Sequence, residues 1–249
     1  MYKGNKVVVV MPAYNAEKTI EQTHREVLSQ GIVDLVVVVD DRSTDETVSV
    51  ADDLEKTIVH RHDQNTGYGG NQKSCYRIAL ENGADIVVMV HPDYQYTPQL
   101  IPAMVSMIAN DLYDCVLASR IIGGQALRGG MPIWKYVANR FLTAAQNLLM
   151  GAKLSEYHTG YRAFTRKLLE RIDLQRNSDD FIFDNQMLTQ VHWAGFRMGE
   201  VSCPTKYFPE ASSINFRRSA KYGLGCLWNA LLFRLARWKV ARPGLFKNL

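Results

Sequence analysis

The sequence has few cysteines and no long apolar run. Its four cysteines lie far apart and match neither a metal-finger spacing nor a disulfide framework, so we expect buried thiols at Cys75, Cys115, Cys203 and Cys226. No segment offers about 18 to 20 uninterrupted apolar residues, which argues against a membrane-spanning helix. The first residues enter a strand-like run at once and lack the features of a signal peptide. We therefore expect a cytoplasmic protein.

Acidic residues are missing from the last part of the chain. Residues 211–249 hold eight Lys and Arg and no Asp or Glu, whereas the remainder holds 21 basic and 25 acidic residues. The net charge of +4 thus combines a mildly acidic body with a basic tail, and we expect no nucleic-acid partner. The 249 residues, 47% hydrophobic, suffice for a sizeable core in one domain with an appendage or in two small domains.

Two common nucleotide motifs are also absent. No G-x-G-x-x-G follows the first predicted strand and no G-x-x-x-x-G-K-[ST] occurs, which disfavours dinucleotide and P-loop folds. What the sequence does contain is a series of short β-branched runs, at Val7–Met11, Leu35–Val39, Thr57–His60, Ile86–Val90 and Cys115–Ala118. Strands alternating with helices predict an α/β fold with a mostly parallel sheet flanked by helices. The helices are expected at Ala16–Gln30, Thr44–Leu54, Gly67–Asn82, Pro132–Met150 and near Phe181–Trp193.

Polar residues follow the first two predicted strands, where ligands bind in an open α/β sheet. The first strand ends in a turn that either contacts a substrate or serves only as a turn, made of Pro12, Ala13, Tyr14 and Asn15. The second ends in Asp40 and Asp41. Adjacent carboxylates after a buried strand need partners such as ribose hydroxyls, a base edge or an arginine. We expect Asp40 to face a nucleoside, whereas Asp41, Ser43 or Asp45 alternatively caps the next helix.

A glycine-rich loop opens the third predicted helix. It spans Asn65–Asn71, and its Gly67 and Asn71 are candidates for contact with a nucleotide, because glycine lets a backbone approach a ligand closely. The alternative is a tight turn that needs no ligand.

The fourth strand ends in the segment His91-Pro92-Asp93-Tyr94-Gln95. Alternate residues of an extended segment point the same way, so His91, Asp93 and Gln95 converge on one point. One nitrogen and two oxygen ligands predict a divalent-cation site completed by diphosphate oxygens and water. The alternative is that Asp93 and Gln95 merely satisfy the turn before Pro98.

Taken together and in order, these motifs resemble a known family. The set PAYN, DDRSTD, NTGYGGN, HPDYQYTP, ASR and HTGYR is similar to family 2 inverting glycosyltransferases of GT-A fold. It is most similar to the branch of dolichol-phosphate mannose synthase and the polyprenyl-phosphate sugar transferases. The resemblance implies a nucleotide-sugar donor and a divalent cation, Mn²⁺ or Mg²⁺. It puts His91, Asp93 and Gln95 on the metal-binding positions and Pro92 beside the nucleotide sugar.

The sequence departs from the family pattern at two positions. Ala16 stands where the family usually has an acidic residue, and His91 replaces the first aspartate of Asp-Ala-Asp-Leu-Gln. Imidazole is a poor ligand for Mg²⁺ but suits transition metals, so Mn²⁺ is favoured if His91 binds the metal.

The resemblance also implies an acceptor region. Arg120, after the fifth strand, matches the family's Gly-Ser-Arg element and would hold phosphate bidentately. The other candidates for the acceptor or its phosphate are Arg140, Thr159, Gly160, Arg162, Arg217 and Lys221. Asp184 falls where family members present an acidic residue, and a hydroxyl acceptor needs such a general base. A phosphate acceptor is already anionic and needs none.

The basic tail admits two interpretations. Arg234, Arg237 and Lys239 lie among Leu, Phe and Trp residues, as in a helix that rests at a membrane interface. Alternatively, the tail forms a last helix packed on the catalytic lobe or in a homo-oligomer interface. The segment from Lys206 to Arg218 is a further candidate for closing over a diphosphate or phosphate.

These expectations combine into one predicted organisation. Residues 1–215 form a GT-A catalytic domain, with a nucleotide-sugar half at about 1–122 and an acceptor half at about 123–215, and residues 216–249 form a basic amphipathic segment. The expected reaction is sugar transfer to a polyprenyl phosphate, by an enzyme peripheral on the inner face of the membrane. The alternatives are transfer to a saccharide or glycolipid hydroxyl with Asp184 as base, and a non-catalytic nucleotide-sugar-binding protein with a degraded metal site.

Overall fold

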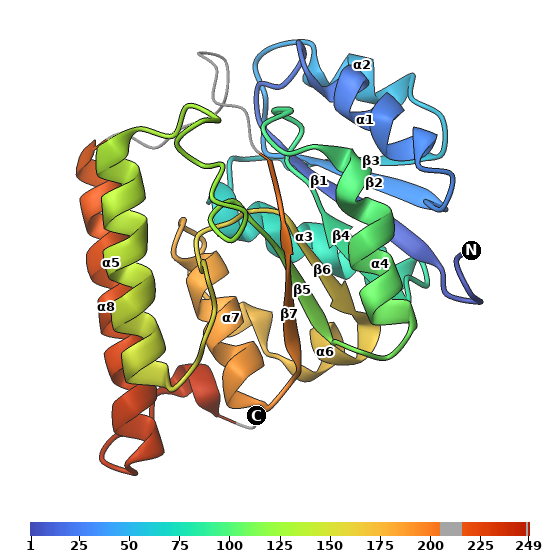
Figure 1. Cartoon of the computed structure of the whole chain (residues 1–249). Coiled ribbons are helices and arrows are strands. Elements are labelled where there is room, and N and C mark those ends of the chain that lie inside the picture. The colour runs from blue at the N-terminus through green and yellow to red at the C-terminus, as the bar shows by residue number, and fades with distance from the viewer. Residues whose placement is uncertain (205–215, 248) are drawn as a thin grey trace.

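A computed structural model describes residues 1–204, 216–247 and 249, which build one seven-stranded sheet in the order β3-β2-β1-β4-β6-β5-β7 (Figure 1). The strands are β1 (Val7–Ala13), β2 (Leu35–Asp40), β3 (Thr57–Arg61), β4 (Ile86–Met89), β5 (Cys115–Ser119), β6 (Arg162–Thr165) and β7 (Met198–Ser202). All pairings are parallel except those of β6, which runs antiparallel to both β4 and β5. The predicted mostly parallel sheet is confirmed.

The two strands β6 and β7 were not predicted. Arg162–Thr165 is only four residues long, and Met198–Ser202 contains a glycine and a glutamate, so neither reads as a β-branched apolar run. Both come from the part of the chain expected to be the acceptor half, and both join the same sheet as β1–β5. β6 lies between β4 and β5, which brings the segment that precedes it beside the ends of those strands.

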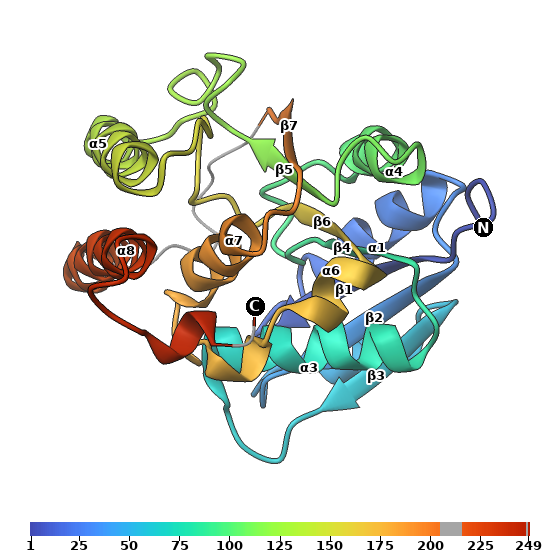
Figure 2. The same ribbon diagram turned by 90° about the horizontal axis from the view of Figure 1, so that it is seen from below.

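Helices cover both faces of the sheet. They are α1 (Ile20–Ser29), α2 (Thr47–Asp52), α3 (Gly67–Glu81), α4 (Ile101–Ala109), α5 (Ile133–Met150), α6 (Arg166–Arg171), α7 (Phe183–Trp193) and α8 (Phe216–Arg237), with short 3-10 turns at Pro98–Leu100, Leu174–Arg176 and Gly244–Phe246. Alternate strand residues face opposite cores. Val8 and Val10 pack with α3, α6 and α7, whereas Val7 and Val9 pack with α1, α2 and α4 (Figure 2).

The first two helices begin later than predicted, at Ile20 and Thr47, because the residues before them form turns. Asn15 adopts a left-handed backbone conformation with φ of 51°, and in neither helix does the side chain of the N-cap residue accept a hydrogen bond from a backbone N–H. The capping role expected of Asp45 is confirmed in another form. Its carboxylate accepts a hydrogen bond from the backbone N–H of Thr47 at 3.1 Å.

The basic tail forms α8, which lies side by side with α5 at one edge of the molecule (Figures 1 and 2). The pair runs parallel, since Gly223 approaches Leu142 and the Arg234 guanidinium donates to the carbonyl of Leu148. The inner side of α8 is buried against α7, where Phe233 contacts Trp193. The tail therefore packs on the rest of the chain. None of the described helices is long and apolar enough to cross a membrane.

Candidate functional site

Asp40 lies at the end of β2 with one carboxylate oxygen unpaired. Its Oδ2 accepts a hydrogen bond from the backbone N–H of Ser43 at 3.0 Å and lies 3.7 Å from the Arg61 Nε. Its Oδ1 is buried and has no hydrogen-bond partner among the described residues. An unsatisfied buried oxygen is costly, so this atom is a candidate for accepting a hydrogen bond from a ligand. The geometry fits the nucleoside-binding role expected of Asp40.

Asp41 has a different environment, although it is the next residue. Its carboxylate accepts hydrogen bonds from the backbone N–H groups of Thr66 and Gly67, at 2.7 and 2.9 Å, and from His62 Nδ1 at 2.9 Å. It therefore stabilises the N-terminus of α3, where a negative charge is favourable. From the sequence, Asp41 was an alternative cap for the helix that directly follows it, α2. The structure instead places its carboxylate at the N-terminus of α3.

The turn after β1 is tied to the turn after β2. The Asn15 N–H donates to the Ser43 hydroxyl at 2.8 Å, and the Asn15 side-chain oxygen accepts from the Thr44 N–H at 2.9 Å. Pro12 and Ala13 are buried, whereas the Tyr14 side chain is 56% exposed. Of the four predicted turn residues, Tyr14 and Asn15 are the exposed ones.

Protein contacts account for the glycine-rich loop. A Cβ atom on Gly67 would lie 2.7 Å from the carbonyl oxygen of Asp179, and one on Gly69 would lie 2.3 Å from that of Ser178. The buried Asn71 amide donates to the carbonyls of Ala13 and Val39 at the ends of β1 and β2. These glycines allow the start of α3 to pack against the segment before α7, as the ligand-free alternative expects.

The His91 ring packs against Tyr68 and Gly160. Its Nε2 lies 3.1 Å from the Tyr68 hydroxyl, the two rings stack at 5.6 Å, and a Cβ on Gly160 would meet that nitrogen at 2.6 Å. Asp93 accepts a hydrogen bond from the Gln95 N–H at 3.1 Å. Residues 1–204, 216–247 and 249 contain no group of three or more His, Cys, Asp or Glu that could hold a metal ion. The Nε2 of His91 is thus already engaged by a protein hydroxyl.

A polar network joins this motif to Asp184 on α7. The Tyr68 hydroxyl donates to Asp184 Oδ2 at 2.7 Å, while Asp184 Oδ1 accepts from Gln72 at 3.0 Å and pairs with Arg162 Nη1 at 3.0 Å. Burial and the charge of Asp184 raise the pKa of Tyr68 well above its ordinary value. Tyr68 therefore remains a hydrogen-bond donor between His91 and Asp184, a role that sequence reasoning missed.

Arg162 is completely buried at the start of β6, although the resemblance implied that it contacts the acceptor or its phosphate. Its guanidinium contacts Asp184 and donates to the Tyr157 carbonyl at 3.2 Å. The negative charge of Asp184 raises the pKa of Arg162 despite burial, which acts in the opposite direction. In this structure, Arg162 supports Asp184 from within the sheet and presents no surface to an acceptor.

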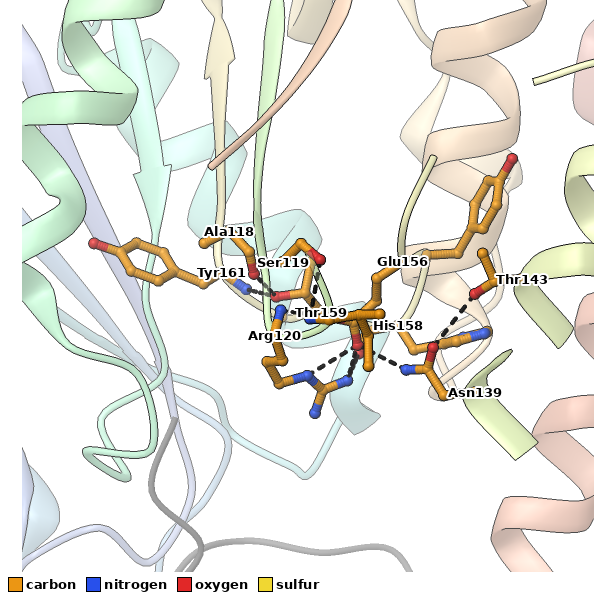
Figure 3. Close-up of polar contacts among 12 residues, drawn as sticks. Ala118, Ser119, Arg120, Asn139, Thr143, Glu156, His158, Thr159 and Tyr161 are labelled. Atoms are coloured by element: carbon orange, nitrogen blue, oxygen red, sulfur yellow. Dashed lines mark hydrogen bonds and ion pairs between the residues drawn. The ribbon is translucent and has the colours of Figure 1, made fainter. Parts of the chain in front are cut away.

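Arg120 pairs with a carboxylate that the sequence analysis overlooked (Figure 3). Its Nε donates to Glu156 at 2.9 Å, and Asn139 of α5 donates to the same carboxylate at 2.8 Å. Glu156 is fully buried; burial raises its pKa, but the charge and hydrogen bonds of Arg120 outweigh burial and lower it. The sequence does contain a signal for a specific role of Glu156, because it is the single acidic residue between Asp114 and Glu170.

The remaining acceptor candidates divide into two groups. In the first group, Arg140 Nη1 donates to the Ser155 carbonyl at 2.7 Å, so it lies beside the segment 155–160 that contains Thr159 and Gly160. Thr159 Oγ1 donates to the Ala118 carbonyl at 2.8 Å (Figure 3). On α8, Lys221 pairs with Asp180 at 3.0 Å and Arg217 is exposed. Most of the segment from Lys206 to Arg218, expected to close over phosphate, lies outside the described residues.

His158 connects the acceptor segment to α8. Its Nδ1 lies 2.9 Å from the Tyr222 hydroxyl, and its Nε2 is buried with no hydrogen-bond partner among the residues that the structure describes. Burial lowers the pKa of His158 from 6.5 to about 4. The folded protein therefore holds this ring neutral at pH values where the unfolded chain binds a proton.

This shift predicts a loss of stability in mild acid. Because the pKa is lowered on folding, stability falls as the pH drops from about 6.5 to about 4. Between pH 7 and pH 5, we expect the wild type to lose about 2 kcal/mol more free energy of unfolding than His158→Gln, which cannot titrate there. Urea denaturation at both pH values measures the difference. Equal losses in the two proteins would contradict a buried neutral His158.

Comparisons with known proteins place the chain in a family. The model of the family described as "Glycosyl transferase family 2" matches residues 8–173. The chain is 29% identical over 217 residues to a UDP-N-acetylglucosamine–dolichyl-phosphate N-acetylglucosaminyltransferase of Methanococcus voltae, covering 81% of this chain and 86% of that protein. It is 26% identical over 206 residues to an undecaprenyl-phosphate mannosyltransferase of Micrococcus luteus, covering 79% and 82%.

A solved structure shows the same fold. Glucosyl-3-phosphoglycerate synthase from Mycobacterium tuberculosis, in complex with Mn²⁺, uridine diphosphate and phosphoglyceric acid, superimposes with a TM-score of 0.67. The match covers 97% of this chain and 81% of that one at 20% sequence identity. At this identity, the likeness establishes the shared architecture, and the substrates must be inferred from the residues of the site.

Proposed function

The chain belongs to glycosyl transferase family 2, and from that premise we propose that it moves a sugar from a nucleotide-diphosphate sugar to a polyprenyl phosphate. The named relatives support this acceptor class, since one acts on dolichyl phosphate and another on undecaprenyl phosphate. The proposal includes action at the cytoplasmic face of a membrane, with peripheral contact through residues 216–249.

The observation that carries the proposed acceptor is the environment of Asp184. A hydroxyl acceptor needs a carboxylate that is free to take its proton. Here one Asp184 oxygen accepts from Tyr68, and the other contacts both Gln72 and Arg162. Both carboxylate oxygens of Asp184 are therefore already engaged by hydrogen-bond donors of the protein. A phosphate acceptor needs no base, so this arrangement favours it over a saccharide or glycolipid hydroxyl.

The donor would bind at the ends of β1 and β2. The unpaired Asp40 Oδ1 is suited to accept a hydrogen bond from the nucleoside, and the exposed Tyr14 ring offers a surface on the turn made of Pro12, Ala13, Tyr14 and Asn15. Asp41, Gly67 and Asn71 would support the donor site without contacting the donor, since their contacts hold the start of α3 against these strand ends.

A divalent cation would be held by Asp93 and Gln95, beside Pro92. Structures of the Mycobacterium tuberculosis enzyme contain uridine diphosphate with Mn²⁺ or with Mg²⁺, which supports a cation of this kind here. When bound, the cation would neutralise the charge of the departing nucleoside diphosphate. With the His91 Nε2 directed at Tyr68, the two oxygen donors suit either ion.

The chain's own residues would position the acceptor for in-line displacement. The exposed Arg140 lies beside the segment 155–160 and can hold an anionic phosphate near the sugar. Arg120 would add positive charge there, because its Nε and Nη2 already donate to Glu156 and to the His158 carbonyl. One phosphate oxygen forms the new bond to the anomeric carbon while the bond from that carbon to the diphosphate oxygen breaks. The configuration inverts, and no proton must leave the acceptor.

The test separates donor binding from transfer. A thermal-shift screen of sugar nucleotides with and without Mn²⁺ should find a donor that stabilises the protein, since ligand at 100 times its Kd adds about 2.7 kcal/mol. With that donor, we expect transfer to a short-chain polyprenyl phosphate and none to the matching polyprenol. Faster transfer to the alcohol would contradict the phosphate acceptor. Binding without any transfer across the panel would favour the non-catalytic alternative.

A further inference from the structure

Helix α5 has the reverse of the polarity expected at a protein surface. Its buried positions include Asn139, Thr143 and Gln146. Its exposed positions include Trp134, Val137, Phe141 and Leu148, the last three 58%, 64% and 79% exposed. The exposed residues recur at spacings of three, four and seven, which places them on one side of the helix. A surface helix of a globular protein normally directs such a stripe into the core.

The inner side of α5 is polar because it serves the acceptor segment and α7. Asn139 donates to the buried Glu156, and Gln146 accepts a hydrogen bond from Asn185 of α7. With these contacts made by the inner face, the apolar stripe faces outward.

Helix α8 presents a second apolar stripe beside the first. Leu224, Trp228 and Leu231 are all exposed and recur at spacings of four and three, and the exposed Trp238 directly follows the helix, while Cys226, Ala230 and Phe233 face inward. α5 and α8 form the outer edge of the molecule, and in the described part of the chain no element covers them from outside (Figure 2). Exposed apolar stripes on two neighbouring helices mark an interaction surface.

The charge of the two helices identifies the partner. α5 contains two basic and no acidic residues, and α8 contains five basic and no acidic residues. A second copy of this chain seated face to face would bring two sets of positive charges together, which disfavours a symmetric dimer. An anionic bilayer instead attracts the basic residues and accepts the Trp, Phe and Leu side chains at its interface.

We propose that the exposed sides of α5 and α8 together form a docking surface for an anionic lipid bilayer. The inference rests on the proposed function in that the acceptor is a membrane lipid. It extends the proposed contact from the tail to α5, a helix distant in sequence. Both helices reach the acceptor segment, α5 through Asn139 and Arg140 and α8 through the contact of Tyr222 with His158. Docking would therefore present the lipid phosphate beside that segment.

Vesicle sedimentation tests this surface. The full chain is mixed with vesicles of phosphatidylcholine containing phosphatidylglycerol and no polyprenyl phosphate, and with pure phosphatidylcholine. We expect binding to the anionic vesicles that weakens as salt rises. The double variant Phe141→Ser/Trp228→Ser should bind roughly tenfold less or weaker still. Leu112→Ser is the matched control and should bind as the wild type does, because Leu112 is 56% exposed in the loop after α4.

The outcomes separate this inference from the proposed function. Turnover of a water-soluble, short-chain polyprenyl phosphate without vesicles should be equal in the wild type and the double variant, whose melting curves check folding. No binding of the wild type to anionic vesicles, or equal binding by the double variant, overturns the docking surface and leaves turnover standing. A dimer that the double variant abolishes, without lipid binding, overturns it in favour of a second copy. Lipid binding without any turnover supports docking and contradicts the proposed reaction.

Discussion

Replacing Asp93 by asparagine should lower turnover by about a thousandfold, the size of effect expected when electrostatic stabilisation of a leaving group is lost. Asp93 follows β4 and is the one carboxylate in the segment His91–Gln95. Asparagine keeps the shape of the side chain but removes the charge that would hold a divalent cation against the departing diphosphate. Steady-state turnover and the Mn²⁺-dependent part of the thermal shift with donor should fall together.

His91 provides the comparison within the same motif. Because its Nε2 faces the Tyr68 hydroxyl, we expect His91→Gln to keep the Mn²⁺-dependent thermal shift that Asp93→Asn loses. Unchanged turnover in Asp93→Asn would sink the proposed cation site. A loss of the metal-dependent shift in His91→Gln would instead identify the imidazole as a ligand and favour a transition metal over Mg²⁺.

Replacing Arg162 by methionine should cost about 3 to 5 kcal/mol of free energy of unfolding, because it leaves a buried carboxylate without its charge partner. Arg162 is fully buried and lies 3.0 Å from Asp184, which is itself 6% exposed. The substitution also removes the hydrogen bond to the Tyr157 carbonyl. Urea denaturation of the wild type and the variant at pH 7 measures the difference.

A double-mutant cycle tests whether the pair is responsible. Asp184→Asn removes the charge but retains an oxygen that can accept from Tyr68 or Gln72, so Arg162→Met should cost less in that background than in the wild type. Arg25→Met is the control, because the Arg25–Glu21 pair is exposed and such pairs contribute little. Equal costs of Arg162→Met in both backgrounds would show that its effect comes from lost packing.

Local pattern was sufficient where a residue's role depends on its neighbours in the chain. The five apolar runs predicted β1 to β5, and the capping of the α2 backbone by Asp45 was expected from its position. The strands β6 and β7 escaped prediction because tertiary neighbours, rather than their own residues, make them strands. β6 is held by β4 on one side and β5 on the other.

Long-range contacts separated residues that looked equivalent. Asp40 and Asp41 are adjacent and similar in sequence, yet Asp41 is directed to the start of α3 and Asp40 keeps an unpaired oxygen. His91, Asp93 and Gln95 share the alternation of a metal site, yet the His91 ring is turned to Tyr68 by stacking and by the close approach of Gly160. The alternation of residues predicts which way side chains point along one extended segment. It does not include the contact with an aromatic ring from another segment, here Tyr68.

The sequence by itself determined the fold class, the family and the strand ends at which the site lies, because these follow from periodicity and from motifs a few residues long. Only the tertiary structure decided which charges are paired: Arg120 with Glu156, and Arg162 with Asp184. It also decided that the apolar side of α5 faces outward. The physical reason is that pairing and burial depend on residues tens of positions apart, which are brought together only when β6 pairs between β4 and β5.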